Sequence, residues 1–106
     1  MFSLGGEDDA LRERATTASD GRAAKTLVEQ GPLRITLVAL TPGTALQPHH
    51  VAGPVSIQTI RGTLRITTDA GEDDLPAGDL VTLGAGVSHT VLALDDCAML
   101  ITVTMP

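Results

Sequence analysis

Apolar and polar residues alternate along most of the chain in short runs that end at turn-forming residues. From residue 25 onward each run stops at a signal such as Gly31-Pro32 or Pro42-Gly43. Alternation with period two places successive side chains on opposite faces of a strand, and turns every 8–12 residues or so are typical of β-sandwiches and barrels. The pattern predicts strands at residues 25–30, 33–40, 55–60, 63–68, 79–83, 89–94 and 98–105.

The second predicted strand, residues 33–40, raises the question of what covers its outer face. Leu37 and the other odd-numbered residues share one face, opposite Arg34. Val38 and Leu40 then add apolar groups to the outer face, and the last strand is apolar on both faces. Such strands need cover from a second sheet or another subunit. We therefore expect a homodimer, with Val38 and Leu40 among its interface residues.

The N-terminal part of the chain has a different pattern. The first six residues are typical of a flexible end, and residues 7–19 carry acidic groups early and arginine later, as a short helix prefers. Leu11 is the only large apolar residue in this segment, so the helix is expected to be weakly held. We therefore divide the chain into a tail with a short helix, residues 1–24, and an antiparallel all-β domain, residues 25–106.

The amino-acid composition argues against nucleic acid and membranes as binding partners of this protein. The net charge is −6 and Phe2 is the sole aromatic residue, so neither a basic patch nor stacking side chains are present for nucleic acid. Apolar runs are too short to cross a membrane, and no leader pattern is visible. Because Cys97 is the single cysteine, the chain cannot form an internal disulfide, which agrees with a reducing cytoplasm. We interpret Cys97 as a small hydrophobic residue. An aliphatic core with few polar groups favours a small-molecule ligand.

The three histidines lie in two Gly-containing stretches. His49 and His50 follow Gly43, and His89 ends the sequence "GAGVSH". The first stretch resembles the motif G-x5-H-x-H-x3-E-x6-G, with matches at Gly43, His49 and Gly62. The second resembles G-x5-P-x-G-x2-H-x3-N, with matches at Gly78, Gly86 and His89. These two motifs, in this order, are those of the cupins.

The resemblance implies the cupin fold, a double-stranded β-helix or jelly-roll barrel, and it implies a metal held by residues from both motifs. This chain departs from the ligand set, because Val51 stands at the second histidine and Val55 at the glutamate. Of the family's ligands, His49 and His89 carry over, and we expect them to converge. Catalytic metal sites generally have three protein ligands, so the full cupin site is absent.

Two further questions stay open at the level of sequence. In a regular strand His50 would point away from His49, whereas a bulge next to Pro48 would turn both rings inward. The face of Gln58 is also open, because alternation counted from the motif position at Val55 and alternation counted from Ile60 place it on opposite sides of the strand. We assign His49, His89 and, least firmly, His50 to a metal site, with Val51, Val55 and Gln58 lining the pocket. Imidazole ligands suit Zn, Ni, Fe or Cu, and a metal-free site is the alternative.

Two kinds of function follow. The first is a metal-dependent enzyme acting on a small organic substrate, such as a dioxygenase, isomerase or lyase. The second is a cupin that binds or senses a ligand without metal, or has a purely structural role. No catalytic residue is assigned beyond the histidines. The acidic run Glu72-Asp73-Asp74 is interpreted as a solvated hairpin tip.

Overall fold

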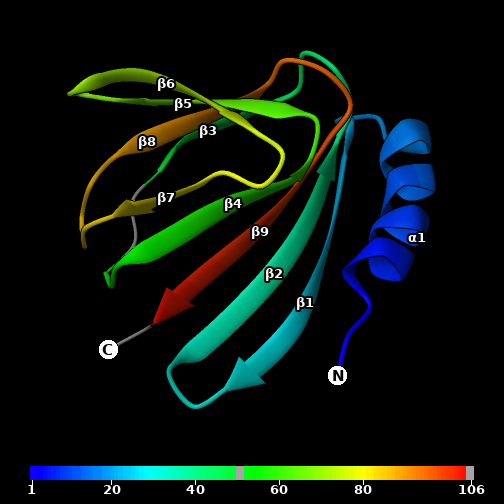
Figure 1. The fold of residues 1–106 in the computed structure, drawn as a ribbon, viewed down its shortest axis with the longest axis horizontal. Helices are drawn as coiled ribbons and strands as arrows, with labels where there is room; N and C mark the ends of the chain where they lie inside the picture. The colour runs from blue at the N-terminus through cyan, green and yellow to red at the C-terminus, as the bar shows by residue number, and fades with distance from the viewer. Residues whose placement is uncertain (50–51, 105–106) are drawn as a thin grey trace.

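The computed structural model describes residues 1–49 and 52–104, and describes side chains over residues 1–46 and 52–104. Within these residues the chain forms one helix followed by nine strands (Figure 1). In chain order they are α1 (Leu4–Thr17), β1 (Arg22–Gln30), β2 (Leu33–Leu40), β3 (Ala45–His49), β4 (Val55–Arg61), β5 (Thr63–Thr68), β6 (Gly71–Pro76), β7 (Leu80–Leu83), β8 (His89–Ala93) and β9 (Cys97–Thr104).

The strands form two antiparallel sheets that face each other across the core (Figure 1). The five-stranded sheet has the order β1-β2-β9-β4-β7, and the four-stranded sheet has the order β3-β8-β5-β6. This is the predicted jelly-roll arrangement, which is confirmed. Two strands were not predicted. One is β3, and the other is β6, which contains the run Glu72-Asp73-Asp74 interpreted as a hairpin tip. The acidic side chains are exposed as expected, but their backbone is a paired edge strand.

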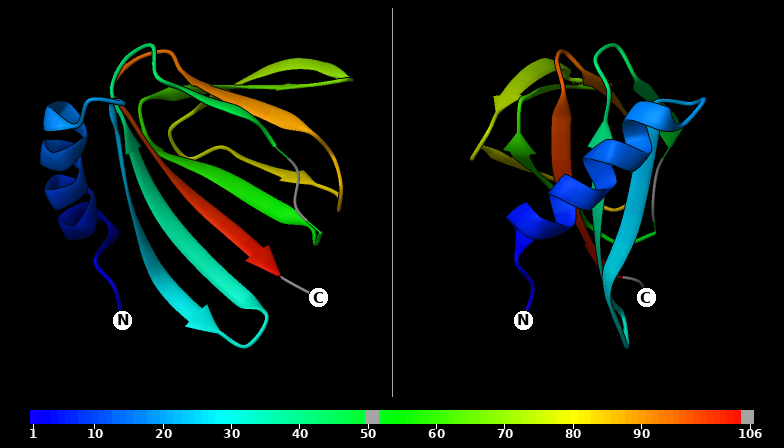
Figure 2. Two further views of the ribbon diagram at one scale, coloured as in Figure 1. Left: turned by 180° about the vertical axis from the view of Figure 1, so that it is seen from behind. Right: turned by 90° about the vertical axis from the view of Figure 1, so that its right-hand side faces the viewer.

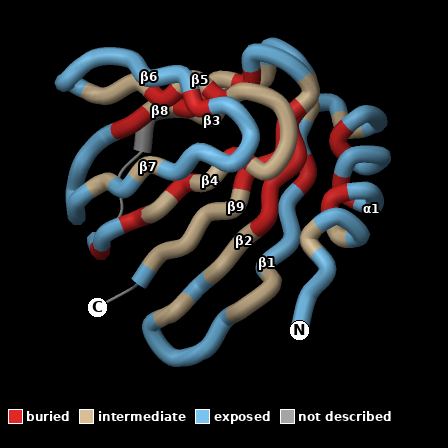
Figure 3. Tube along the Cα trace, viewed as in Figure 1, coloured by how far each residue is buried: buried red, intermediate tan, exposed pale blue. Residues whose placement is uncertain are grey.

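The core between the sheets is aliphatic. Leu64 is 0% and Ile66 2% exposed, which confirms the inward face predicted for that strand. Around them pack buried residues from both sheets, namely Val38, Leu40, Val55, Ile57, Leu75, Val91, Ala93, Cys97 and Met99. Burial is concentrated where the sheets overlap and decreases toward the β1–β2 hairpin (Figure 3).

Strand β2 uses its two faces in the opposite way to the prediction. Val38 and Leu40 lie in the core between the sheets, so they are not available for a subunit interface. Leu37 and Ala39 point outward and are buried by the helix α1. The sequence pattern could not separate these faces because both are apolar. The interface assigned to Val38 and Leu40 is therefore wrong, and the homodimer itself stays a prediction.

Helix α1 is longer and better anchored than the sequence indicated. It begins at Leu4, where the residues were expected to be flexible, because Ser3 caps it and accepts a hydrogen bond from Gly6 N–H at 3.4 Å. The helix crosses the outer face of β1 and β2 (Figure 2). Leu11 and Ala15 are 1% and 2% exposed there. Burying the leucine side chain contributes about 2 kcal/mol, so this one large residue makes a substantial contribution to docking the helix.

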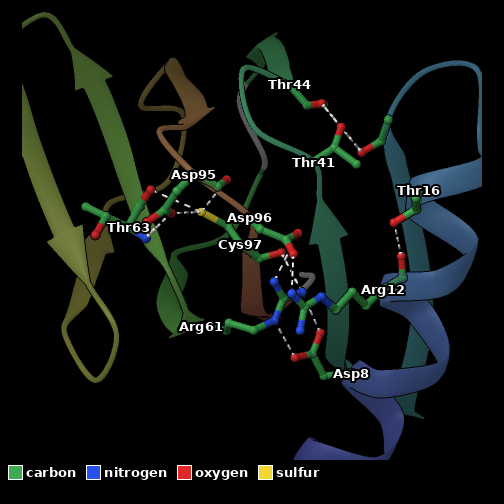
Figure 4. A network of polar contacts seen from close by, with 11 residues as sticks. Asp8, Arg12, Thr16, Thr41, Thr44, Arg61, Thr63, Asp95, Asp96 and Cys97 are labelled. Atoms are coloured by element: carbon green, nitrogen blue, oxygen red, sulfur yellow. Dashed lines mark hydrogen bonds and ion pairs between the residues drawn. The ribbon is translucent and has the colours of Figure 1, made fainter.

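An arginine at the end of β4 connects the helix to the barrel (Figure 4). Arg61 donates two hydrogen bonds to the Asp8 carboxylate of α1, at 2.8 and 3.1 Å, and its Nη1 lies 3.0 Å from Asp96. It also donates to the Cys97 carbonyl oxygen at 3.2 Å. Arg12 of α1 reaches the same Asp96 at 2.7 Å. The paired carboxylate of Asp8 raises the pKa of Arg61 above its ordinary value despite partial burial.

The β4–β5 turn packs against the segment that precedes β9. Thr63 N–H donates to Asp95 Oδ1 at 2.7 Å, and the Cys97 thiol donates to the Thr63 carbonyl oxygen at 3.1 Å. Gly62 sits between them with φ +77°, where a Cβ would collide with the Asp96 carbonyl oxygen and lie 2.9 Å from Cys97 Sγ. The close approach of these two turns therefore requires glycine at position 62.

Among the described residues, no helix is long and apolar enough to cross a membrane.

Replacing Gly62 by alanine is expected to lower the free energy of unfolding by about 3 kcal/mol or more, since strain at positive φ adds to a backbone collision. Urea denaturation followed by circular dichroism measures the change. Gly31→Ala is the matched control, because φ is +58° there but nothing lies within 4 Å of the added Cβ. The control should lose only about 1–2 kcal/mol. Equal losses in both variants would contradict the packing of the two turns.

Cys97 is expected to be unreactive in the folded chain. Its side chain is 0% exposed, and burial, followed by the nearby Asp95, raises the pKa of the thiol to about 11. At pH 8 only about a thousandth of such thiols are ionised, so reaction with a disulfide reagent should follow unfolding. The measurement compares reaction rates in buffer and in urea. A rapid stoichiometric reaction of the native protein would disprove it.

Candidate metal and ligand site

The backbone pairing of β3 with β8 brings the two histidine motifs together. In this antiparallel pair Leu46 lies opposite Val91 and His49 lies opposite His89. The register shifts between Leu46 and His49, which marks a bulge in β3. Cα atoms of directly opposed residues lie about 4.5–5.5 Å apart. The backbone therefore brings together two positions that are 40 residues apart in the chain.

His89 faces the interior. It is 2% exposed and alternates with the partly exposed Thr90, so it shares its face with the core residues Val91 and Ala93. Its Nδ1 lies 3.1 Å from the Val87 carbonyl oxygen. A carbonyl oxygen can only accept, so Nδ1 carries the proton in this bond. In the neutral ring the lone pair is then on Nε2, the usual arrangement of a metal-binding histidine with its second nitrogen hydrogen-bonded.

The predicted lining residues divide between the two sides of β4. Val55 is 5% exposed and belongs to the core between the sheets. Gln58 alternates with Ile57 and Thr59, which are buried inside, and it pairs with Leu100 of the outer cluster under α1. Ile60 also packs in that outer cluster. The assignment of Gln58 to the pocket therefore disagrees with its place in the sheet, whereas Val55 is inside.

The remaining predicted residues follow β3. His50 and Val51 lie outside the described residues, so their predicted roles stay predictions. For His49 the description covers the backbone alone. The sequence interpretation also placed Arg34 outside, whereas its strand alternation places it inside, on the same face as Val38.

The described residues do not form a complete cupin metal site, and the two-imidazole site stays a prediction. Among the residues the structure describes, no three His, Cys, Asp or Glu side chains gather as metal ligands. The motif position of the carboxylate ligand is Val55, which is packed in the apolar core. Two imidazoles suit Zn, Ni, Fe or Cu, with the other coordination positions left to water or a ligand.

The turn geometry agrees with the motif match. The glycines matched to the two motifs, Gly43, Gly62, Gly78 and Gly86, all have positive φ.

A surface depression lies on the solvent side of α1 and is built from this one helix alone. It is lined by Asp9, Arg12, Glu13, Arg14, Thr16 and Thr17. It lacks groups converging from other elements, so it is not a candidate site.

No protein-family model matches the sequence, and no curated protein matches it. Solved structures do match. A conserved protein of unknown function from Streptococcus pyogenes is 27% identical, with a TM-score of 0.76 over 84% of this chain and 78% of that one. A cupin superfamily protein from Desulfitobacterium hafniense is 19% identical, with a TM-score of 0.78 over 80% of this chain and 78% of that one.

Two similar structures belong to proteins with specific names. KdgF from Halomonas sp. is 17% identical, with a TM-score of 0.72 over 80% of each chain. A salicylate 1,2-dioxygenase mutant from Pseudoaminobacter salicylatoxidans is 19% identical, with a TM-score of 0.85 over 97% of this chain but 34% of that one. The chain therefore has the fold of the cupin superfamily.

The hydrogen bond of His89 leads to a prediction about its tautomer. At a pH where the ring is neutral, the proton is expected on Nδ1, because that nitrogen donates to the Val87 carbonyl oxygen. Long-range ¹H–¹⁵N correlation spectra of the labelled protein distinguish the two ring nitrogens. The same spectrum in urea serves as the control, since this hydrogen bond is lost there. Finding the proton on Nε2 in the folded protein would show that the bond is absent.

Proposed function

We propose that this protein is a small-molecule-binding cupin with a reduced metal site, in which His49 and His89 hold one divalent transition metal. The observation that carries the proposal is the pairing of His49 opposite a His89 that is buried and faces inward. The fold supports the same location, because the matched histidine of each motif lies on one of these two paired strands. Zn, Ni, Fe and Cu are the metals that such ligands favour.

The chain's own residues would do two things at this site. The Val87 carbonyl oxygen accepts a hydrogen bond from Nδ1 of His89 and so holds the ring, which leaves the lone pair of the neutral imidazole on Nε2. Val55 and Val91 supply an apolar wall that holds the apolar part of a ligand and limits access of water. A bound metal would act as a Lewis acid and leave coordination positions for a substrate. A salicylate 1,2-dioxygenase shares this fold, which supports metal-assisted chemistry as the first candidate.

The second candidate is a cupin that binds its ligand without metal and without catalysis. The observation in its favour is Val55, which places an apolar side chain where the motif has a carboxylate. In that case His89 would act as a hydrogen-bonding group toward the ligand. The two candidates differ in a single measurable property, namely stoichiometric metal binding.

The test is a metal titration of protein stripped with a chelator. Each of Zn²⁺, Ni²⁺, Fe²⁺ and Cu²⁺ is added, and binding is followed by calorimetry and elemental analysis after dialysis. Wild type is expected to bind one ion per chain. His49→Ala and His89→Ala should each weaken binding by at least roughly tenfold to a hundredfold, the loss that even outer-shell changes cause.

His50→Ala tests the least firmly assigned ligand, since it removes an imidazole from the same segment. It should lower the affinity much less than His49→Ala. Because His89 is buried, the circular dichroism spectrum of each variant must first show that it is folded. Failure of folded wild type to retain any of the four ions would reject the metal site in favour of the metal-free alternative.

A further inference from the structure

One row of paired residues crosses the whole five-stranded sheet at the end that carries Val55. Glu29 of β1 pairs with Arg34 of β2, and Arg34 pairs with Val103 of β9. Val103 pairs with Val55 of β4, and Val55 pairs with Leu83 of β7. Val55 stands at the position of the missing metal ligand, so this row passes through the candidate site.

The row faces the interior of the sandwich. Val55, Val103 and Leu83 all pack in the core between the sheets. The β2–β9 register runs without a shift from Leu33 to Leu40, so Arg34 shares the face of the core residue Val38. Arg34 is therefore an inward-facing cation, although the sequence pattern had placed it outside.

Exposure increases along the row toward Arg34. Val55 is 5% exposed, Val103 is half-buried, and the Arg34 side chain is 47% exposed. Figure 3 shows that burial also decreases along β2 and β9 toward the β1–β2 hairpin, which is the end of the sheet where Arg34 lies. Solvent, and thus a small molecule, reaches the inner face next to the arginine while the β4 end is covered.

The row also touches the segment that follows β3. Gly53 is buried, and a Cβ there would collide with the Thr104 carbonyl oxygen, so this segment lies on the end of β9. Thr104 is the neighbour of Val103 and pairs with Leu33. Two strand spacings separate Arg34 from Val55, which is roughly 10 Å. That distance is about the length of a small organic molecule.

The contact that Arg34 makes leaves it able to bind an anion. Its Nη2 donates to Glu29 Oε1 at 2.8 Å, which uses one of the five N–H donors of a guanidinium. Glu29 is 67% exposed, and exposed ion pairs of this kind contribute little to stability. Arg22 is another inward-facing basic residue of this hairpin. It pairs with Leu40 at the other end of the sheet, so it lies away from the row that contains Arg34.

We infer that Arg34 binds the carboxylate of a small organic acid, whose apolar part lies against the half-buried Val103 and extends along the row toward Val55. This inference rests on the proposed function, because it names the ligand class of the same site. A guanidinium matches a carboxylate with two parallel hydrogen bonds, and the aliphatic row matches an apolar body. In a chain of net charge −6, an anionic ligand needs such a local cation.

The experiment uses metal-free protein, so that a metal cannot bind the probe. Benzoate, its neutral isostere benzamide, and inorganic phosphate are titrated and followed by NMR chemical shifts. Wild type is expected to bind benzoate at least about tenfold more tightly than benzamide, as a charge-assisted pair implies, and phosphate more weakly than benzoate. Arg34→Gln should bring the benzoate-to-benzamide ratio close to one. Glu29→Gln should tighten benzoate binding, because a competing carboxylate is gone.

Arg65→Gln is the matched control, because Arg65 forms a cross-strand pair with Asp74 at 2.9 Å in the other sheet. It should leave the ratio unchanged. An unchanged ratio in Arg34→Gln, no preference of wild type for benzoate, or phosphate binding as tight as benzoate would each overturn the inference. If the metal titration fails while Arg34 still selects benzoate, only the metal part of the proposed function falls.

Discussion

The ion-pair cluster around Arg61 is the interaction on which the arrangement of the other parts depends. One guanidinium contacts the helix through Asp8 and the segment before β9 through Asp96 and the Cys97 carbonyl oxygen. The helix, the end of β4 that carries Arg61, and the segment before β9 come from the beginning, middle and end of the chain. The helix held in this way covers Leu37 and Ala39. Without that cover, the outer face of the five-stranded sheet would expose apolar side chains to water.

Strand positions and fold class could be predicted because they depend on local patterns. Alternation identified the inward face of Leu64 and Ile66, and the resemblance of two glycine- and histidine-containing motifs to those of the cupins implied the barrel. The faces of β2 could not be predicted, because a strand covered on both sides is apolar on both sides. The missing information was the docked helix, which is anchored largely by Leu11 and by the buried Asp8. A small apolar stripe of this kind gives a weak sequence signal.

The candidate site shows the same division between local and long-range information. Motif spacing was sufficient to select His49 and His89, and the strand register places these positions opposite each other. Arg34 carries no local signal, since its relation to Val55 depends on β9, which comes about 70 residues later in the chain. The face of Gln58 stayed open in the sequence for a related reason. Gln58 shares a face with Ile60, and that apolar residue lies on the outer face because helix α1 covers it there. The sequence did not show this cover.

Strand β6 forms an edge of the four-stranded sheet and carries Glu72, Asp73 and Asp74, all exposed. An edge strand offers unpaired backbone groups to other chains, and charged side chains oppose that pairing. Two such edges brought together would place acidic groups against acidic groups. The Arg65 guanidinium lowers the pKa of Asp74, so this carboxylate keeps its charge further into acid than an isolated one. The acidic run therefore protects the sheet against edge-to-edge aggregation, and strong acid removes that protection.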